Sequence, residues 1–238
     1  MKKLLLTSVL SFSAVFAASD ADILGLYDQE AMKSHGLKME IVDRKALNDG
    51  SGFEMVTLKM SQGEMAQEDI VFVKDDILVQ DIVNLKTKES LKGKLQADKL
   101  TAALGEVYAK EDAKNIIKLG NDASKPTLLM LTDPNCPYCR MELGNIEESL
   151  KTNNYEIVIT SLSNESAPKS AKIYEEIVTA KDDAAKIAIL KKYYAEDAPE
   201  VKGVEAAEIE RLRKLSDSYF GTGITGVPFI IDVKEIKK

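Results

Sequence analysis

Cysteine and histidine are scarce in this sequence of 238 residues, which contains two cysteines and one histidine. Proteins that depend on disulfides for stability usually contain several pairs, so a disulfide-stapled scaffold is excluded. A structural zinc site uses four ligands, whereas Cys136, Cys139 and the distant His35 supply three, so we expect no metal. With these two kinds of site excluded, the two cysteines, only three positions apart, remain candidates for thiol chemistry.

Basic residues and long apolar runs are also few. The chain has 32 lysine and arginine residues against 39 aspartate and glutamate residues, a net charge of −7. Nucleic-acid binding depends on clustered Lys and Arg that displace counterions, so we expect no nucleic-acid partner. Beyond the N-terminal segment no run approaches the ~20 apolar residues that cross a bilayer, so we expect a soluble mature protein.

The N-terminus has the pattern of a secretory signal peptide. Lys2-Lys3 is a basic start, and Leu4–Phe16 is apolar apart from small hydroxyl residues. Val15 and Ala17 then stand at the −3 and −1 positions of a cleavage site. A membrane anchor is the alternative, but the run is too short to span a bilayer. We therefore expect residues 1–17 to be removed from an exported protein.

The next segment predicts a small α+β domain over residues 18–86. Apolar residues recur at helical spacing over 21–33, and short Val/Ile-rich runs then predict strands. Asp75-Asp76, between two of these runs, predicts a hairpin turn. The expected strands are 38–42, 53–60, 70–74 and 77–85.

Residues 87–120 are predicted to be a linker that contains a helix. The stretch begins polar and lysine-rich, and from Asp98 onward apolar residues recur at the spacing of an amphipathic helix. Gly120-Asn121-Asp122 ends that pattern. The apolar positions are Leu100, Leu104, Val107, Ile116 and Ile117.

Residues 121–238 alternate strand and helix patterns, which predicts an α/β catalytic domain. Its first strand is a continuous apolar run that ends at Asp133-Pro134. Three helical patterns in a row predict a helical insertion at about 165–220. The expected elements are a strand at 127–132, a helix at 137–150, a strand at 155–162, helices around 168–180, 183–195 and 203–220, and a strand at 229–233.

Cys136 and Cys139 frame the sequence Cys-Pro-Tyr-Cys at the predicted junction of a strand and a helix. Residues three apart on a helix lie one turn apart, which brings the two sulfurs close enough to bridge. Pro137 suits the first helical turn, so we expect Cys136 at or beside the N-cap. The free N–H groups and the helix dipole there favour a thiolate, which is the attacking species in disulfide exchange.

Cys139, one turn inside the helix, is expected to be more buried and to act as the resolving thiol. A purely stabilising disulfide is the alternative, but closing so short a loop gains only about 2 kcal/mol in the chain-entropy model. The pattern therefore favours a redox pair. We expect no cofactor besides the reversible Cys136–Cys139 disulfide.

Val227-Pro228 follows a glycine-rich turn and precedes the last predicted strand. That placement is consistent with a cis peptide bond, although only ~5–6% of X-Pro bonds are cis. Alone the signal is weak, but it is more informative in a chain that also carries Cys-x-x-Cys.

The segment from Thr132 to Cys139, together with Gly226-Val227-Pro228, resembles the active site of a thioredoxin fold. More specifically, the chain resembles the DsbC/DsbG thiol:disulfide interchange proteins of the bacterial periplasm. The resemblance covers an N-terminal domain, a helical linker and a catalytic domain with a helical insertion. It implies a V-shaped homodimer, joined through the N-terminal domains, with two active sites facing a cleft.

The resemblance also implies roles for individual residues. Cys136 would be the nucleophile, Cys139 would resolve it, and Pro228 would be a cis-proline packed against the disulfide. The backbone of Val227 would pair with a bound polypeptide, as an added strand does. Pro137 and Tyr138, between the cysteines, complete the predicted substrate-binding set, although Tyr138 could equally be passive.

The sequence departs from the family pattern at three places. Val227 precedes the proline, where DsbC-like members often have Thr. A valine at this position is more similar to the DsbA oxidases. Met130 stands six residues before Cys136, where thioredoxins place a buried acid. Only ten residues follow Pro228, too few for the usual closing strand and terminal helix. We expect either that the inserted helices cover that sheet face or that the sheet edge is open.

Three functions are compatible with these features. The leading hypothesis is a periplasmic disulfide isomerase or reductase that rearranges wrong disulfides in misfolded exported proteins and is kept reduced by a DsbD-type membrane reductase. A DsbA-like net oxidase, served by a DsbB-type oxidase, is favoured by Pro137-Tyr138 and Val227. The third is a dimeric chaperone whose redox pair is secondary.

Overall fold

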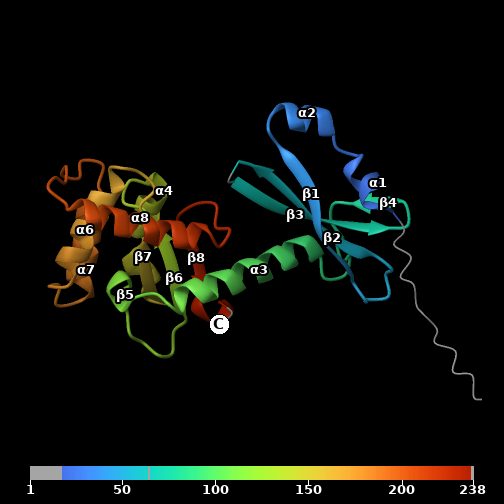
Figure 1. Cartoon of the computed structure of the whole chain (residues 1–238). Coiled ribbons are helices and arrows are strands. Elements are labelled where there is room, and N and C mark those ends of the chain that lie inside the picture. The colour runs from blue at the N-terminus through green and yellow to red at the C-terminus, as the bar shows by residue number, and fades with distance from the viewer. Residues whose placement is uncertain (1–17, 64, 237–238) are drawn as a thin grey trace, which may run out of the picture. The chain divides into compact units, whose positions relative to one another are not determined.

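The computed structural model describes residues 18–63 and 65–236 and divides the chain into two compact units. The division falls between Gln96 and Ala97. Figure 1 labels the helices and strands of both units. The predicted signal peptide lies outside the described residues. Within the described ranges, no helix is both long enough and apolar enough to cross a membrane.

The first unit begins with two short helices where the sequence predicted one over 21–33. α1 (Asp20–Leu24) is capped by the side chain of Ser19, and α2 (Gln29–Ser34) is capped by the side chain of Asp28. Ser and Asp are among the strongest N-cap residues because their oxygens accept from unpaired N–H groups. Because Asp28 caps a new helix, the predicted span contains two short helices instead of one.

A four-stranded antiparallel sheet follows, with strand order β1-β2-β3-β4. Its strands are β1 (Lys38–Ala46), β2 (Glu54–Gln62), β3 (Met65–Lys74) and β4 (Ile77–Val79). Lys74 pairs with Ile77 across Asp75-Asp76, which confirms the predicted hairpin turn. β4 ends at Val79 and is shorter than the predicted 77–85. Two residues later the Asp81 carboxylate accepts a hydrogen bond from the Lys92 N–H, so this part of the chain is bonded to the start of the next helix instead of to the sheet.

One face of this sheet carries a small apolar core. Val56 and Leu58 are buried between half-buried neighbours on β2, the alternation of a strand with one covered face. The first half of β3, Met65–Asp69, is exposed. The buried cluster consists of Ala18, Ile23, Val56, Leu58, Val71 and Val73.

Helix α3 (Leu91–Tyr108) crosses the division between the units and ends well before the predicted stop at Gly120. A short turn, η1 (Ala113–Asn115), follows, and then β5 (Ile117–Leu119). In β5 the alternation of buried Ile117, exposed Lys118 and buried Leu119 has the period of a strand rather than that of a helix. The end of the predicted linker therefore belongs to the sheet of the second unit.

The second unit is built on a mixed sheet of order β5-β7-β6-β8. β6 pairs in parallel with β7 and antiparallel with β8, while β5 pairs antiparallel with β7. The strands beside β5 are β6 (Thr127–Thr132), which matches the prediction, β7 (Asn154–Ile159) and β8 (Phe229–Asp232). This mixed sheet with its helices is the predicted α/β arrangement.

Five helices accompany this sheet between β6 and β8. The predicted helix 137–150 is two helices, because Gly144 and Asn145 are poor helix formers and Asn145 leaves the helical conformation. The three helices of the expected insertion all form between β7 and β8, close to their predicted spans. The five are α4 (Pro137–Gly144), α5 (Ile146–Ser149), α6 (Ser166–Ile177), α7 (Asp183–Tyr194) and α8 (Ala206–Phe220).

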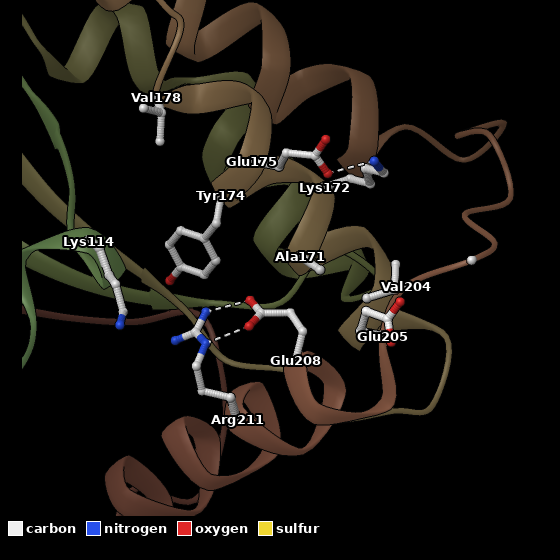
Figure 2. Close-up of a pocket in the computed structure, with 11 residues that line it drawn as sticks. Lys114, Ala171, Lys172, Tyr174, Glu175, Val178, Val204, Glu205, Glu208 and Arg211 are labelled. Atoms are coloured by element: carbon white, nitrogen blue, oxygen red, sulfur yellow. Dashed lines mark hydrogen bonds and ion pairs between the residues drawn. The ribbon is translucent and has the colours of Figure 1, made fainter.

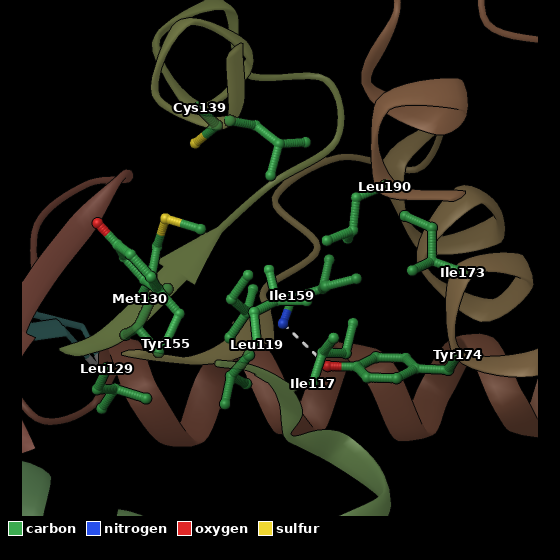
Figure 3. Close-up of a cluster of buried hydrophobic side chains, with 14 of the residues drawn as sticks. Ile117, Leu119, Leu129, Met130, Cys139, Tyr155, Ile159, Ile173, Tyr174 and Leu190 are labelled. Carbon is green, nitrogen blue, oxygen red and sulfur yellow. Dashed lines mark hydrogen bonds between the residues drawn. The ribbon is translucent and has the colours of Figure 1, made fainter. Parts of the chain in front are cut away.

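The core of the second unit lies around its two central strands. All residues of β7 except Glu156 are buried, and so are the last four residues of β6. Figure 3 shows part of this cluster, in which Tyr174 of α6 accepts a hydrogen bond from the Ile159 N–H at 2.9 Å. Strands buried on both faces explain why their sequences are continuous apolar runs instead of alternating ones.

The C-terminal edge of the sheet is β8. Of the two outcomes expected for the short segment after Pro228, the described residues show the open edge, since no strand within them pairs with the outer side of β8. A short turn, η2 (Val233–Glu235), follows, and Ile236 returns to the buried core.

Candidate active site

Cys136 lies where β6 gives way to α4, and it is the N-cap of that helix, as the sequence predicted. Its backbone is extended, with φ −80° and ψ 121°, and Pro137 occupies the first helical turn. The Cys136 N–H donates to the Asp133 carbonyl at 3.1 Å, and the Cys136 carbonyl accepts from the Arg140 N–H at 3.1 Å. The half-buried thiol is thereby held beside the unpaired N–H groups of the helix N-terminus.

The late Val-Pro element lies against this thiol. The Cys136 Sγ donates to the Val227 carbonyl oxygen at 3.5 Å. The Val227–Pro228 peptide bond is cis, which confirms the sequence-based expectation. Two segments that are 91 positions apart in the sequence are therefore brought together at one sulfur.

Cys139 is 0% exposed and belongs to the apolar core of the second unit. The Asp133 N–H donates to its Sγ at 3.4 Å. Burial raises the pKa of the Cys139 thiol to about 12, while hydrogen bonds from the Thr132 side chain and the Asp133 backbone act in the opposite direction. The prediction that Cys139 is the more buried cysteine is confirmed.

Asp133 fastens the loop that carries Cys136. Its carboxylate is buried and accepts the Asn135 N–H at 2.6 Å and the Leu162 N–H at 2.7 Å. The two bonds join the loop after β6 to the loop after β7. The position of an aspartate directly after a buried strand was a usable signal in the sequence, yet the sequence interpretation gave Asp133 no role.

Asn135 extends this network to α6. Its amide nitrogen donates to the Ser163 hydroxyl at 3.2 Å, and its amide oxygen accepts from the Lys169 ammonium at 2.8 Å. A cation is therefore held against the residue that immediately precedes Cys136. Nothing in the sequence pattern pointed to Lys169, which reaches the site only through the packing of the insertion.

Two further contacts connect α4 and β6 to the end of α7. The Tyr194 hydroxyl donates to Thr132 Oγ1 at 3.2 Å, and the Arg140 Nε donates to the Tyr194 carbonyl at 2.5 Å. Arg140 also pairs with the Glu196 carboxylate at 2.7 Å. Thr132 and Tyr194 are both buried. The sequence interpretation missed Tyr194 as well, because its role depends on the fold of the insertion.

The surface beside Cys136 is apolar. Tyr138 is 70% exposed and Met141, on the next turn of α4, is 66% exposed. Pro137 is exposed too, while Val227 and Pro228 are half-buried. The residues that the sequence assigned to substrate binding therefore lie on α4 and on the turn before β8, the two segments that meet at the Cys136 sulfur.

Met130 is fully buried in the core beneath this site. Figure 3 shows its side chain in the same cluster as Cys139. The position where the sequence analysis noted a missing acid is therefore occupied by an apolar side chain with no proton to exchange.

A separate cavity of about 550 Å³ lies between α6, α8 and the loop before β5 (Figure 2). Four of its charged groups form two ion pairs: Arg211 Nη2 lies 2.7 Å from a Glu208 oxygen, and Lys172 lies 2.5 Å from Glu175. Neither cysteine lines it. We assign this cavity no part in thiol chemistry.

Similarity to known proteins was found at the level of structure. The chain is similar to Helicobacter pylori DsbG with a TM-score of 0.52 and 22% identity, over 85% of this chain and 97% of that chain. The catalytic domain of Proteus mirabilis ScsC matches with a TM-score of 0.38 and 22% identity, over 55% of this chain and 84% of that one. Wolbachia pipientis α-DsbA2 matches with a TM-score of 0.42 and 15% identity, over 60% and 87%.

No family model matches the chain, and no curated protein matches it either. The similarity to Helicobacter pylori DsbG shows the fold: the chain has a thioredoxin-like fold similar to that of DsbG.

Proposed function

We propose that the chain is a thiol–disulfide oxidoreductase in which Cys136 attacks and Cys139 resolves. The proposal rests on the unequal placement of the pair: Cys136 is half-buried at the N-cap of α4, whereas Cys139 is buried one turn further on. Unpaired N–H groups and the helix dipole stabilise negative charge at an N-cap, so the thiolate forms where a substrate can reach it. The DsbG-like fold agrees with this chemistry.

In the proposed reaction the Cys136 thiolate attacks one sulfur of a substrate disulfide. The other substrate sulfur leaves as a thiolate and takes up a proton. The resulting mixed disulfide has two fates. Attack by Cys139 on the Cys136 sulfur forms the Cys136–Cys139 disulfide and releases a substrate that has gained two electrons. Attack by a second substrate thiol regenerates Cys136 and leaves a rearranged substrate disulfide without net redox change.

Pro137, Tyr138, Val227 and Pro228 are proposed to bind the substrate chain around this sulfur. The carbonyl of Val227 already lies 3.5 Å from the Cys136 sulfur. A peptide joined to Cys136 would therefore lie alongside the Val227 backbone and could pair with it as an added strand. Exposed aromatic and apolar side chains, such as Tyr138 and Met141, suit unfolded polypeptide with little sequence preference.

The first unit is proposed to pair two copies of the chain. It contains no cysteine, and β4 pairs with only the last three residues of β3, while the first half of β3 is exposed. A long exposed strand is a template for pairing with another chain. Two active sites on one dimer would let a substrate stay bound through repeated exchange, which isomerisation requires.

The leading function is therefore disulfide isomerisation and reduction in the periplasm, on misfolded or misoxidised exported proteins. A DsbD-type membrane reductase would supply electrons. Net oxidation by a DsbA-like route, with a DsbB-type partner, is the alternative, supported by Val227 before the proline. A dimeric chaperone with secondary redox activity is the third, supported by exposed apolar residues on the first sheet, such as Met65.

Covalent trapping tests the proposed thiol chemistry. Full-length Cys139→Ala, produced with its leader, should accumulate mixed disulfides with exported proteins because no second thiol releases them. Full-length Cys136→Ser is the matched control and should trap none. Adducts in the control but not in Cys139→Ala would reverse the assignment of roles, and no adducts in either variant would contradict the function.

The redox state of the pair in the cell separates isomerase from oxidase. Acid quenching followed by alkylation reports the fractions of dithiol and disulfide. A mostly dithiol pair supports an isomerase kept reduced by a membrane reductase. A mostly disulfide pair would overturn the isomerase assignment in favour of the oxidase.

A further inference from the structure

The peptide group between Thr132 and Asp133 joins the end of β7 to the resolving thiol. Its carbonyl oxygen, on Thr132, accepts hydrogen bonds from the N–H and the hydroxyl of Thr160 at 2.8 and 3.3 Å. Its N–H, on Asp133, donates to the Cys139 Sγ at 3.4 Å. The carbonyl and the N–H of a planar trans peptide point in opposite directions. The bonds to Thr160, directly after β7, therefore direct this N–H toward the sulfur.

The sulfur of Cys139 lies in an apolar core. Cys139 is fully buried, and burial raises the pKa of its thiol to about 12. Negative charge in such a place is strongly disfavoured unless hydrogen bonds stabilise it. A donor held on the sulfur therefore favours the thiolate, which is the form that attacks a disulfide.

The Asp133 side chain extends the link between β6 and β7 past the ends of the strands. Donors recur at every second residue along a strand of a parallel pair, so the next donor after the Thr160 N–H is the Leu162 N–H. A continued ladder would pair it with the Pro134 carbonyl, as Thr160 pairs with Thr132. The Leu162 N–H instead donates to Asp133 Oδ2 at 2.7 Å. The carboxylate thus replaces a backbone acceptor where the chain turns from β6 toward α4.

Both oxygens of this buried carboxylate accept hydrogen bonds. Oδ1 accepts from the Asn135 N–H at 2.6 Å, and Oδ2 accepts from the Leu162 N–H. The Asp133 carbonyl also accepts from the Cys136 N–H at 3.1 Å. Hydrogen bonds to a charged acceptor are stronger than those between neutral groups. Asp133 is therefore fixed to the loops on both sides of it, and these bonds keep its N–H on the Cys139 sulfur.

We propose that the Asp133 N–H stabilises the Cys139 sulfur during the resolving attack and that the buried Asp133 carboxylate positions this N–H. The proposal rests on the proposed function, in which Cys139 attacks the mixed disulfide. In that step the S–S bond between Cys136 and the substrate breaks, and the Cys136–Cys139 bond forms. Cys139 is oxidised, the substrate sulfur is reduced, and the proton lost by Cys139 is balanced by one taken up by the leaving substrate thiolate.

A single-turnover experiment on the reduced full-length protein measures the two attacks separately. The protein is mixed with excess oxidised glutathione between pH 6 and pH 11 and quenched in acid after increasing times. Intact mass distinguishes dithiol, glutathione adduct and internal disulfide. Appearance of the adduct reports attack by Cys136, and its conversion to the internal disulfide reports attack by Cys139.

The pH dependence of conversion distinguishes positioning of the donor from a general loss of structure. Conversion rises with pH as Cys139 ionises and levels off above its pKa. The Cys136 thiol helps to raise that pKa to about 12, and the adduct lacks this thiol, so conversion should level off at lower pH. A weaker donor moves the rise to higher pH, whereas a distorted site lowers the rate by the same factor at every pH.

Asp133→Asn keeps the shape of the side chain but replaces one acceptor oxygen with an NH2 group, which then faces an N–H. We expect it to slow conversion at pH 7 about three- to ten-fold, because hydrogen bonds to charged groups are strong. The rise with pH should move up by about half a unit to one unit, and adduct formation should change much less. Asp133→Ser keeps one acceptor and adds no such clash. It tests the proposal if Asp133→Asn does not fold, and it should shift the profile in the same direction.

Asp183→Asn is the matched control. The Asp183 carboxylate also accepts a backbone N–H, that of Gly120, at 2.7 Å. Gly120 follows β5, whose Leu119 pairs with Tyr155 near the start of β7, whereas Cys136 follows the carboxyl end of the neighbouring parallel strand β6. The control should lower stability in urea without moving the pH profile of conversion.

A pH profile that keeps its position in both Asp133 variants, whatever its height, would overturn the proposal, and so would an equal shift in Asp183→Asn. Equal slowing of adduct formation and conversion by Asp133→Asn would also overturn it, because the residue would then support the loop as a whole. A wild-type protein that forms neither adduct nor internal disulfide would instead refute the proposed function itself.

Discussion

The two units cover their sheets to different extents, and the difference agrees with the separate roles proposed for them. In the second unit β6 and β7 are buried along almost their whole length, and the core cluster is several times larger than that of the first unit. In the first unit one face of the sheet packs on a small core, and half of β3 is exposed. A thoroughly covered sheet can hold two cysteines in different environments, whereas an exposed sheet offers surface to a partner or a substrate.

The largest expected effect concerns the unit with the cysteines. Cys136→Ser should reduce the rate of insulin disulfide reduction to the uncatalysed level, because no other described side chain offers an exposed thiolate. Cys139→Ser should keep the attack but turn over more slowly than wild type, because only the thiols of the added reductant can then release the mixed disulfide. Turbidity of the insulin B chain with dithiothreitol as reductant measures both. Activity of Cys136→Ser at the level of wild type would break the contrast between the two units.

Truncation tests whether the second unit is self-sufficient. A fragment from Ala97 keeps Leu104, Ile117 and Leu119, all of which are buried in its core. It should fold, remain monomeric and exchange thiols with small disulfides, but lose isomerase activity on scrambled ribonuclease. A fragment from Asn121 lacks these three side chains and should be less stable by about 4.5–9 kcal/mol, at about 1.5–3 kcal/mol for each buried side chain.

Sedimentation, urea unfolding and ribonuclease refolding of full-length protein and both fragments decide the point. A monomeric full-length protein, or an Ala97 fragment that isomerises as well as full-length protein, would remove the proposed role of the first unit. Equal stability of the two fragments would contradict the assignment of β5 to the second core.

Matched core substitutions compare the two units directly. Leu58 is buried in the first core and Leu129 in the second. Each change to Ala should lower the free energy of unfolding of its own unit by about 2–5 kcal/mol, with the smaller loss in the thinner first core, which can relax more. Amide hydrogen exchange, measured for individual peptides, shows which unit loses protection in each variant. A uniform loss of protection across both units from either substitution would show that they unfold as one.

The smallest effect is a pH dependence that comes from Cys139. Its folded pKa is raised from 9.0 to about 12 by burial, so below about pH 9 both states hold the proton and stability is unaffected. Above that pH the unfolded chain releases the proton while the folded protein keeps it, and stability falls with rising pH until about 12.

At pH 10 the loss attributable to Cys139 in the reduced protein should be about 1.4 kcal/mol. Urea unfolding of reduced wild type against Cys139→Val at pH 8 and pH 10 measures it, because the other titrating groups are common to both. An identical change with pH in the two proteins would show that the Cys139 thiol is not held neutral by its burial.

Local patterns predicted much of this fold. The structure of β6 depends on a continuous apolar run, and the start of α4 depends on the proline after Cys136. Both signals lie in adjacent residues, so the strand, the N-cap and the placement of the cysteines could be predicted from the sequence. Helix ends were less predictable. Ile116 and Ile117 continued a helical spacing from Leu104, but pairing with β7 placed Ile117 in a strand, a choice made by tertiary contacts that no local window contains.

The cysteines of the site were visible in the sequence, but their supports were not. The spacing of Cys136 and Cys139 identifies them as a redox pair, and the position of Pro228 after a glycine-rich turn indicates its role. Lys169 and Tyr194 lie 33 and 58 positions beyond Cys136 in the numbering of the chain, on helices whose packing brings them back to β6 and α4. Their contacts, to Asn135 and to Thr132, depend on the whole fold of the insertion.

The most direct test of the central claim is the order in which the two thiols react. Reduced full-length protein is treated at pH 7 with less than one equivalent of iodoacetamide, and the labelled cysteine is identified by peptide mapping. Cys136 is half-buried at an N-cap and Cys139 is buried with its thiol pKa raised to about 12, so the account predicts label on Cys136 almost alone. Label that appears first on Cys139, or equally on both, would contradict it.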